Sequence, residues 1–167
     1  MTTKIVVVSD THCRLWEEVH PEIRKAVAEA DVAVHCGDYT QLEVVEGVRR
    51  SAKRAVVVHG NSDTVELRRA IPRTEVIELE GKRIGITHPP WGGPPFELPE
   101  LLVDFPEPVD VILFGHVHET FNETLDGILY VNPGQGYSSF RVPATIAVLT
   151  LDDGRVDTEI RLIEAGR

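Results

Sequence analysis

Apolar positions in the first third of the chain follow two different periods. Continuous, largely β-branched runs at residues 5–8, 32–34 and 55–58 predict strands that are buried on both faces. Between these runs, apolar residues recur three and four positions apart, which predicts helices. The first helix is expected to begin at Pro21, because proline suits the first helical turn, and the second to include Val45. This β-α-β-α-β order predicts parallel strands joined by right-handed crossovers.

The remaining two-thirds consists of short apolar runs separated by turn residues. Three pairs of runs are joined by Gly-containing turns and predict hairpins, with the turns at residues 80–82, 126–127 and 152–154. Residues 98–105 have helical spacing, and residues 109–114 predict another buried strand. We therefore expect an α/β fold in which two mixed β-sheets pack face to face with flanking helices. Strand pairing is expected to be parallel early in the chain and antiparallel late.

Composition supports one ordered domain. The chain has 167 residues, 42% of them hydrophobic and 26% charged, so we expect a single domain that spans residues 1–167. No apolar run approaches the roughly 20 residues of a membrane span, and no signal-peptide pattern is recognised. We therefore expect a cytoplasmic protein without a membrane partner. The two cysteines, Cys13 and Cys36, form no disulfide framework and are interpreted as small buried thiols.

The charge balance bears on the choice of partner. Seventeen basic and 27 acidic residues give a formal net charge of −10. Non-specific nucleic-acid binding depends on Lys and Arg neutralising phosphates, so a nucleic-acid partner is not expected. A small phosphorylated substrate held through metal ions remains compatible with this charge.

Polar residues of metal-ligand type follow five of the predicted strands at their carboxyl ends. Ligands of α/β sheets bind at this edge, so distant segments are expected to meet there. The candidate ligands are Asp10, His12, Asp38, Asn61, His88, His116 and His118.

The number and type of these side chains predict the cofactor. Seven oxygen and nitrogen donors are too many for one ion with an open position. They suit two ions about 3.5–4 Å apart that share a bridging carboxylate. Carboxylate and imidazole without thiolate favour transition metals over Ca²⁺, so we expect two divalent metal ions, Mn²⁺ ahead of Fe, Zn, Ni or Co.

In their order and spacing, the motifs resemble the signature of the calcineurin-like metallophosphoesterases. The chain is similar to the small, single-domain bacterial and archaeal phosphodiesterases of that superfamily. The motifs are Asp10-Thr11-His12, Gly37-Asp38, Gly60-Asn61-Ser62-Asp63, His88, Gly115-His116-Val117-His118 and Asn132-Pro133-Gly134.

The resemblance implies the fold of these enzymes, a metallophosphoesterase sandwich, and a role for each candidate. Asp10, His12 and His118 would hold one metal, and Asn61, His88 and His116 the other. Asp38 would bridge both metals. A hydroxide between the metals would attack the phosphorus of a small organic phosphate, so that Asp38 and Asn61 act in catalysis through the metals.

Two positions depart from the pattern of this superfamily. Many members have His where this chain has Ser62, and a serine cannot act as a general acid near neutral pH. Small members usually have Gly-His after the strand-end His, where this chain has Pro89-Pro90. The Pro- and Gly-rich loop that follows is expected to reshape the substrate edge. The residues that bind substrate are therefore open; Arg14, Trp91 and Arg141 are weak candidates.

Other polar residues near these motifs have simpler explanations. His35 and His59 are expected to be structural, and Asp63 to fix a turn or support a ligand through a hydrogen bond. Two other functions stay open. The same fold resembles a retromer subunit that serves as a protein-interaction scaffold. Larger superfamily members cut DNA, although the acidic balance of this chain argues against a nuclease. The sequence leaves the preference for monoesters or diesters, and assembly into a homo-oligomer, undecided.

Overall fold

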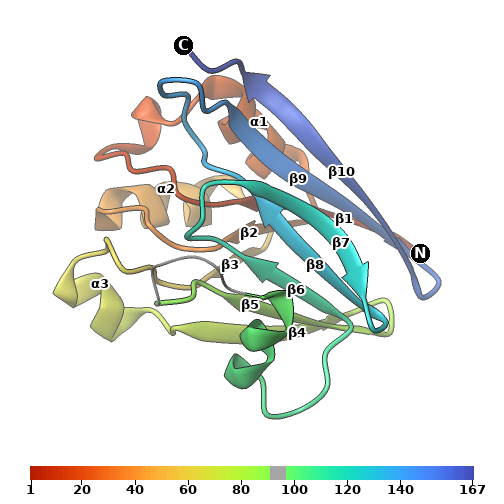
Figure 1. Ribbon diagram of the computed structural model, residues 1–167. Helices are drawn as coiled ribbons and strands as arrows, with labels where there is room; N and C mark the ends of the chain where they lie inside the picture. The colour runs from red at the N-terminus through yellow and green to blue at the C-terminus, as the bar shows by residue number, and fades with distance from the viewer. Residues whose placement is uncertain (91–96) are drawn as a thin grey trace.

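The computed structural model describes residues 1–90 and 97–167, which form two mixed five-stranded sheets packed face to face (Figure 1). In spatial order, the first sheet contains β10 (Arg155–Glu164), β9 (Ala144–Asp152), β1 (Thr2–Val8), β2 (Val32–His35) and β3 (Ala55–Val57). The second contains β4 (Thr74–Leu79), β5 (Lys82–Thr87), β6 (Val111–Phe114), β8 (Ile128–Pro133) and β7 (Thr120–Leu125). The predicted two-sheet α/β architecture is confirmed.

The position of β1 between two covered faces explains why all four of its residues 5–8 are apolar. Ile5 and Val7 pack into the layer between the two sheets, whereas Val6 and Val8 pack against the helices outside the first sheet. Successive side chains of a strand point to opposite faces, so a strand covered on both sides needs apolar residues at every position.

The helices flank the sheets and are short. They are α1 (Pro21–Glu29), α2 (Leu42–Ser51) and α3 (Val65–Ala70), with 3₁₀ turns η1 (Trp16–Glu18) and η2 (Leu98–Asp104). Pro21 occupies the first turn of α1 as predicted, and His20 Nδ1 accepts a hydrogen bond from the Glu22 amide at 3.2 Å. The sequence did not predict α3, because Leu67 is its one buried residue and gives no periodic signal. The helical segment at 98–105 is a 3₁₀ helix.

Strand pairing agrees with the prediction in the first sheet and corrects it in the second. Strands β1, β2 and β3 pair in parallel, as expected from the crossovers. In the second sheet β6 pairs in parallel with both β5 and β8, so the expectation of antiparallel pairing late in the chain was wrong for these pairs. A parallel pair needs a connection of about a dozen residues or more, and the sequence between the end of β5 and the start of β6 is longer than this. Strand β7 reverses the chain between β6 and β8.

The three predicted hairpins are confirmed: β4–β5, β7–β8 and β9–β10 are antiparallel pairs. In each two-residue turn, both residues have positive φ, the conformation of a type I′ turn that matches the twist of the strands. The turns are Glu80-Gly81, Asp126-Gly127 and Asp153-Gly154.

The topology decides where chemistry can occur. The parallel strands of both sheets end at one edge of the sandwich, and the segments that follow β1, β2, β3, β5 and β6 meet there (Figure 1). Among the described residues, no helix has the length and apolar character needed to cross a membrane.

Candidate metal centre

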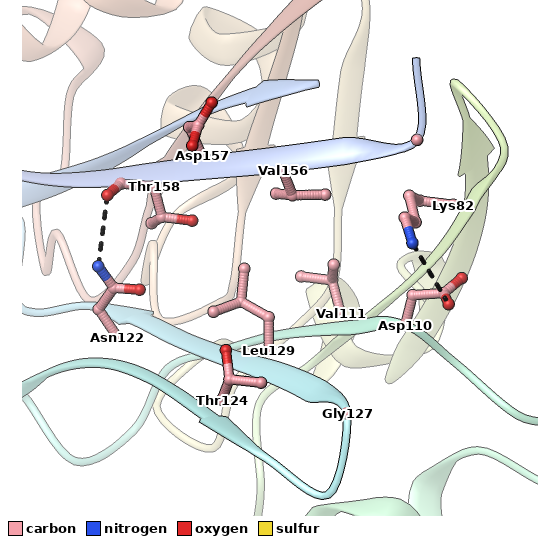
Figure 2. A pocket seen from close by; sticks show the side chains of 11 residues that line it. Lys82, Asp110, Val111, Asn122, Thr124, Gly127, Leu129, Val156, Asp157 and Thr158 are labelled. Carbon is pink, nitrogen blue, oxygen red and sulfur yellow. Dashed lines mark hydrogen bonds and ion pairs between the residues drawn. The ribbon is translucent and has the colours of Figure 1, made fainter. Parts of the chain in front are cut away.

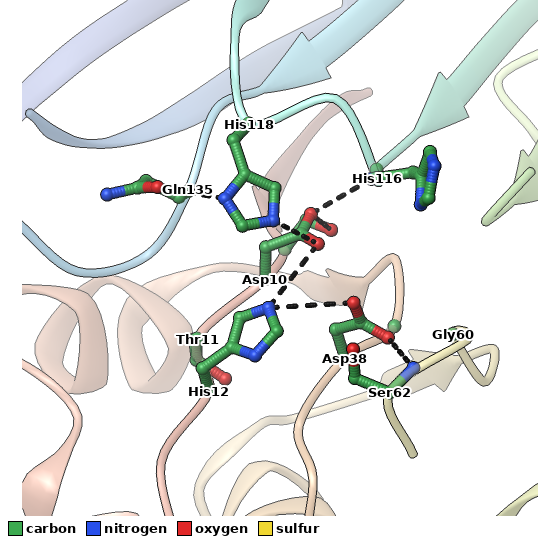
Figure 3. Close-up of polar contacts among 12 residues, drawn as sticks. Asp10, Thr11, His12, Asp38, Gly60, Ser62, His116, His118 and Gln135 are labelled. Carbon is green, nitrogen blue, oxygen red and sulfur yellow. Dashed lines mark hydrogen bonds and ion pairs between the residues drawn. The ribbon is translucent and has the colours of Figure 1, made fainter. Parts of the chain in front are cut away.

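The loops at this edge bring the seven predicted ligand residues together in two adjoining groups. In the first group, one ligand atom from each residue lies within 4.8 Å of the others (Figure 3). Its members are Asp10, His12, Asp38 and His118. Asp10 and Asp38 are buried, and the two histidine side chains are 27% and 32% exposed, so solvent reaches the group from the histidine side.

The second group surrounds Asn61. Its side-chain Oδ1 lies 2.9 Å from His88 Nε2 and 2.9 Å from His116 Nδ1. Asp38 connects this group to the first, because its Oδ2 lies 3.5 Å from both His88 Nε2 and His12 Nε2. One carboxylate oxygen therefore faces both groups.

Each carboxylate has one oxygen anchored by the protein and the other turned into the site. Asp10 Oδ2 accepts hydrogen bonds from the Ser9 hydroxyl at 2.6 Å and the His116 amide at 3.1 Å. Asp38 Oδ1 accepts one from the Ser62 amide at 2.8 Å. The anchors leave Asp10 Oδ1 and Asp38 Oδ2 to face the histidines.

The tautomer of His88 follows from its partners. Its Nδ1 lies 2.7 Å from the Cys36 carbonyl, which can only accept, so Nδ1 carries the proton. In the neutral ring, Nε2 then has a lone pair, and this lone pair faces Asn61 Oδ1 and Asp38 Oδ2, which are also acceptors. Acceptors from three residues thus converge without a donor between them.

Two buried atoms of the first group test whether a metal ion fits. Asp10 Oδ1 and His12 Nε2 have no hydrogen-bond partner in the part of the chain that the structure describes. Buried polar atoms normally have a hydrogen-bond partner or a ligand. A carboxylate oxygen and an imidazole nitrogen can both bind a cation, so a metal ion would satisfy these two atoms. The donor set is oxygen and nitrogen without thiolate, which fits divalent ions such as Mn²⁺, Fe²⁺ or Zn²⁺.

The electrostatics of the site also attract positive charge. Burial alone would raise the pKa of Asp10, but contacts with His118 and His12 outweigh it and hold this pKa well below its usual value. The contact with Asp10 raises the pKa of His118, whereas burial lowers the pKa of His116. The side of the site around Asp10 therefore stabilises a cation.

The backbone at the site is strained. Five of the seven residues have φ between 48° and 83°, a region that costs most side chains on the order of 1–3 kcal/mol but that Asp and His tolerate better. They are Asp10, His12, Asp38, His116 and His118. The surroundings also demand glycine: a Cβ on Gly60 would lie 2.1 Å from Asp38 Oδ1. A side chain at position 60 would clash with Asp38, so glycine at this position lets the two ligand loops approach each other.

The neighbouring polar residues predicted to be structural have structural contacts. His35 is buried, its Nδ1 accepts from the Gly37 amide at 3.2 Å, and its Nε2 lies 3.1 Å from the Thr11 hydroxyl. His59 Nδ1 contacts the Ile71 carbonyl at 2.7 Å.

Asp63 joins two of the ligand loops, as its predicted supporting role requires. Its Oδ2 accepts from the amides of Asp38 at 3.0 Å and Gly60 at 2.7 Å, and its Oδ1 accepts from the Thr40 amide at 2.7 Å. The loops that carry Asp38 and Asn61 are therefore held to one carboxylate.

Two of the three candidates for substrate binding, Arg14 and Arg141, do not join this cluster. Arg14 and Arg141 are exposed. The Arg14 amide donates to Glu18, and the Arg141 guanidinium lies 5.0 Å from the Phe140 ring centroid. Trp91 lies outside the described residues.

Sequence reasoning missed two residues that support the ligands, Ser9 and Gln135. Ser9 donates to Asp10, and Gln135 Oε1 lies 2.9 Å from His118 Nδ1. Both residues could have been found from their places beside the motifs, because Ser9 precedes the first ligand and Gln135 follows Asn132-Pro133-Gly134.

A separate pocket of about 320 Å³ lies between β10 and the β7–β8 hairpin, near the opposite ends of β5 and β6 (Figure 2). Three of its polar side chains have contacts nearby: Lys82 Nζ is 4.0 Å from Asp110, and the Asn122 amide donates to the Thr158 carbonyl at 3.4 Å. None of the seven candidate ligands lines it. The candidate ligands therefore lie away from this pocket, at the carboxyl ends of the strands.

Comparison with known proteins agrees with this geometry. Residues 3–154 match the sequence profile of the calcineurin-like phosphoesterase superfamily domain. The chain is 36% identical over 138 residues to a probable metallophosphoesterase of Methanocaldococcus jannaschii, a match that covers 80% of this chain and 68% of the relative. It is 28% identical over 162 residues to a phosphodiesterase of the same organism, covering 87% and 92%.

Solved structures show the same fold. A Thermotoga maritima protein solved by NMR superposes with a TM-score of 0.76 at 33% identity, covering 96% of this chain and 99% of that one. Vps29 from Entamoeba histolytica in complex with Zn²⁺ superposes with a TM-score of 0.68 at 21% identity, covering 95% and 98%, which shows likeness of fold alone.

Proposed function

The chain belongs to the calcineurin-like phosphoesterase superfamily, and from this premise we propose that it is a binuclear metal-dependent phosphodiesterase that hydrolyses a small organic phosphate. The observation that carries the proposal is the position of Asp38 Oδ2, which lies 3.5 Å from one histidine of each group, His12 and His88. An oxygen shared by two ligand sets is what a two-ion site requires. The phosphodiesterase among the relatives supports diester over monoester cleavage.

Each group of side chains would hold one ion. Asp10, His12 and His118 would hold the first, and Asn61, His88 and His116 the second, with Asp38 between them. Mn²⁺ is the proposed ion, with Fe, Zn, Ni or Co as alternatives that the same donors accept. When bound, such ions would activate water for in-line attack and neutralise charge on the phosphoryl oxygens.

The chain orients the side chains that would take part in this chemistry. The amides of Ser62 and His116 and the Ser9 hydroxyl hold the two carboxylates, so little reorganisation is needed when phosphate binds. The Cys36 carbonyl keeps the His88 ring in one tautomer. The exposed faces of His12, His118 and Asn61 mark the side from which a substrate would enter.

A missing proton donor limits the substrates that this site would cleave fast. Ser62 is exposed beside Asp38, and its hydroxyl can donate a hydrogen bond but cannot protonate a leaving group near neutral pH. We therefore propose a preference for esters with good leaving groups.

The alternative is a protein-interaction scaffold on the same fold. A scaffold without catalytic demand would be expected to lose ligands, yet this chain keeps all seven and the hydrogen bonds that orient them. Metal binding alone does not separate the two functions, because the E. histolytica Vps29 structure also contains Zn²⁺. Turnover must be measured.

The test combines metal content with hydrolysis. Elemental analysis of the purified protein should give about two divalent ions per chain. Hydrolysis of bis(p-nitrophenyl) phosphate should stop after exhaustive chelation and return with added Mn²⁺. Activity that survives chelation would refute the metal mechanism. A folded protein that is offered Mn²⁺ and shows neither metal nor activity would favour the scaffold.

A further inference from the structure

Gln135 is a buried amide that the proposed chemistry leaves without a role. It follows β8 and is 2% exposed. Its Nε2 donates to the Tyr137 carbonyl at 2.7 Å and the Ser139 hydroxyl at 2.9 Å, and its Oε1 lies 2.9 Å from His118 Nδ1 (Figure 3). A surface glutamine would not need three partners.

The partners fix the orientation of this amide. The Tyr137 carbonyl can only accept, so the nitrogen of Gln135 must face it, and the oxygen must face His118. His118 Nδ1 therefore donates to Gln135, and Nε2 is the nitrogen turned toward Asp10 Oδ1 at 3.2 Å. In the neutral ring this leaves the Nε2 lone pair open toward the first group.

The backbone keeps Gln135 in place. Its carbonyl accepts from the Thr145 amide at 3.0 Å, and the next amide, that of Gly136, donates to the Asp10 carbonyl at 3.2 Å. One short segment thus contacts both the backbone of Asp10 and the imidazole of His118.

We propose that Gln135 is a positioning residue that holds His118 with Nδ1 protonated and Nε2 free, and thereby sets the metal affinity of the group Asp10, His12, Asp38 and His118. This role in affinity rests on the proposed function. Without Gln135, a proton on Nε2 could bond to the buried Asp10 carboxylate, and that tautomer has no lone pair where the ion would bind. Hydrogen-bond partners of ligating histidines commonly change metal affinity by about 10–100-fold.

Three variants separate positioning from packing. Gln135→Met keeps the length and removes the acceptor. Gln135→Glu keeps an oxygen that accepts from His118 but loses both donors, and Ser139→Ala is the control because it leaves the His118 contact intact. If the role of Gln135 is purely structural, Gln135→Glu should lose the most Mn²⁺ affinity, since its carboxylate would face the Tyr137 carbonyl. If Gln135 positions His118, Gln135→Met should lose the most Mn²⁺ affinity.

Two measurements decide the matter. Long-range ¹H–¹⁵N correlation spectra are recorded on the metal-free protein at a pH where the His118 ring is neutral. They should show the proton on Nδ1 of His118 in the wild type, in Gln135→Glu and in Ser139→Ala. In Gln135→Met the proton should be on Nε2. Calorimetric titration with Mn²⁺ should show that one of the two sites binds about 10–100-fold more weakly in Gln135→Met. The affinities of Gln135→Glu should be close to those of the wild type. The second site, around Asn61, is the internal control.

Other outcomes overturn the proposal. Nε2–H in the wild-type protein would refute the tautomer. Equal Mn²⁺ affinities in Gln135→Met and the wild type would refute the positioning role. Equal losses of Mn²⁺ affinity in Gln135→Glu and Gln135→Met would refute it as well. Absence of Mn²⁺ binding by the wild type would refute the proposed function and the role in affinity with it, whereas the metal-free spectra still decide the tautomer separately.

Discussion

The backbone amide of Ser62 donates a hydrogen bond to Asp38 Oδ1 at 2.8 Å. This bond turns the other oxygen of Asp38 toward His12 and His88. Because the donor is the amide, the serine side chain is not needed for it. The orientation of the central carboxylate and the chemistry of residue 62 can therefore be varied independently.

Asp38→Asn should weaken both metal sites together. An amide carries no negative charge to share between two ions, and its single oxygen can face either the Ser62 N–H or the histidines but not both. We expect turnover of bis(p-nitrophenyl) phosphate to fall about 100-fold or more, and metal content to drop below two ions per chain. Asp157→Asn, an exposed position on β10, is the control. Wild-type metal content and rate in Asp38→Asn would show that this carboxylate is not a bridge.

Ser62→His should add the proton donor that the site lacks. An imidazole titrates near neutral pH and can protonate a leaving oxygen. We expect hydrolysis of alkyl phosphodiesters to gain about 10-fold or more, and aryl esters, which leave without a proton, to gain little. Ser62→Asn is the control for side-chain size. Equal gains for both kinds of ester would exclude a missing acid as the limit on rate.

His35 should make the fold sensitive to acid. Burial lowers its pKa to about 3 from a usual value of 6.5, so the unfolded chain binds the proton more tightly than the folded one. The stabilisation is present above pH 6.5 and is lost as pH falls from about 6.5 toward 3. Between pH 7 and pH 5, this single group should remove about 2 kcal/mol of unfolding free energy.

The measurement is urea unfolding of the chelated protein at both pH values. His35→Gln can still accept from Gly37 and donate to Thr11, but does not titrate. Its stability should fall about 2 kcal/mol less than that of the wild type over this interval. His20→Gln, at the start of α1, is the control for loss of a histidine elsewhere. Parallel pH dependences in His35→Gln and wild type would contradict the prediction.

The sequence by itself determined the elements whose signal is local. Apolar runs such as residues 5–8 mark strands covered on both faces, and Asp126-Gly127 marks a type I′ turn, because strand burial and positive φ restrict residue type directly. It also determined that ligand-type residues follow five strand ends. Ligands of α/β folds bind at the carboxyl ends of the strands, and this rule was enough to expect the seven candidates to meet, although their strands belong to two sheets.

Tertiary structure decided everything that depends on distant partners. The His116 amide that anchors Asp10 is 106 positions away in sequence, and no local pattern reports such a bond. The parallel pairing of β6 with β8 likewise depends on where β7 reverses the chain. Which oxygen of Asp38 faces the site, and which nitrogen of His118 keeps its lone pair, follow from Ser62 and Gln135. Side-chain orientation is set by directional hydrogen bonds across the fold, whereas sequence periodicity reports only which face of an element is buried.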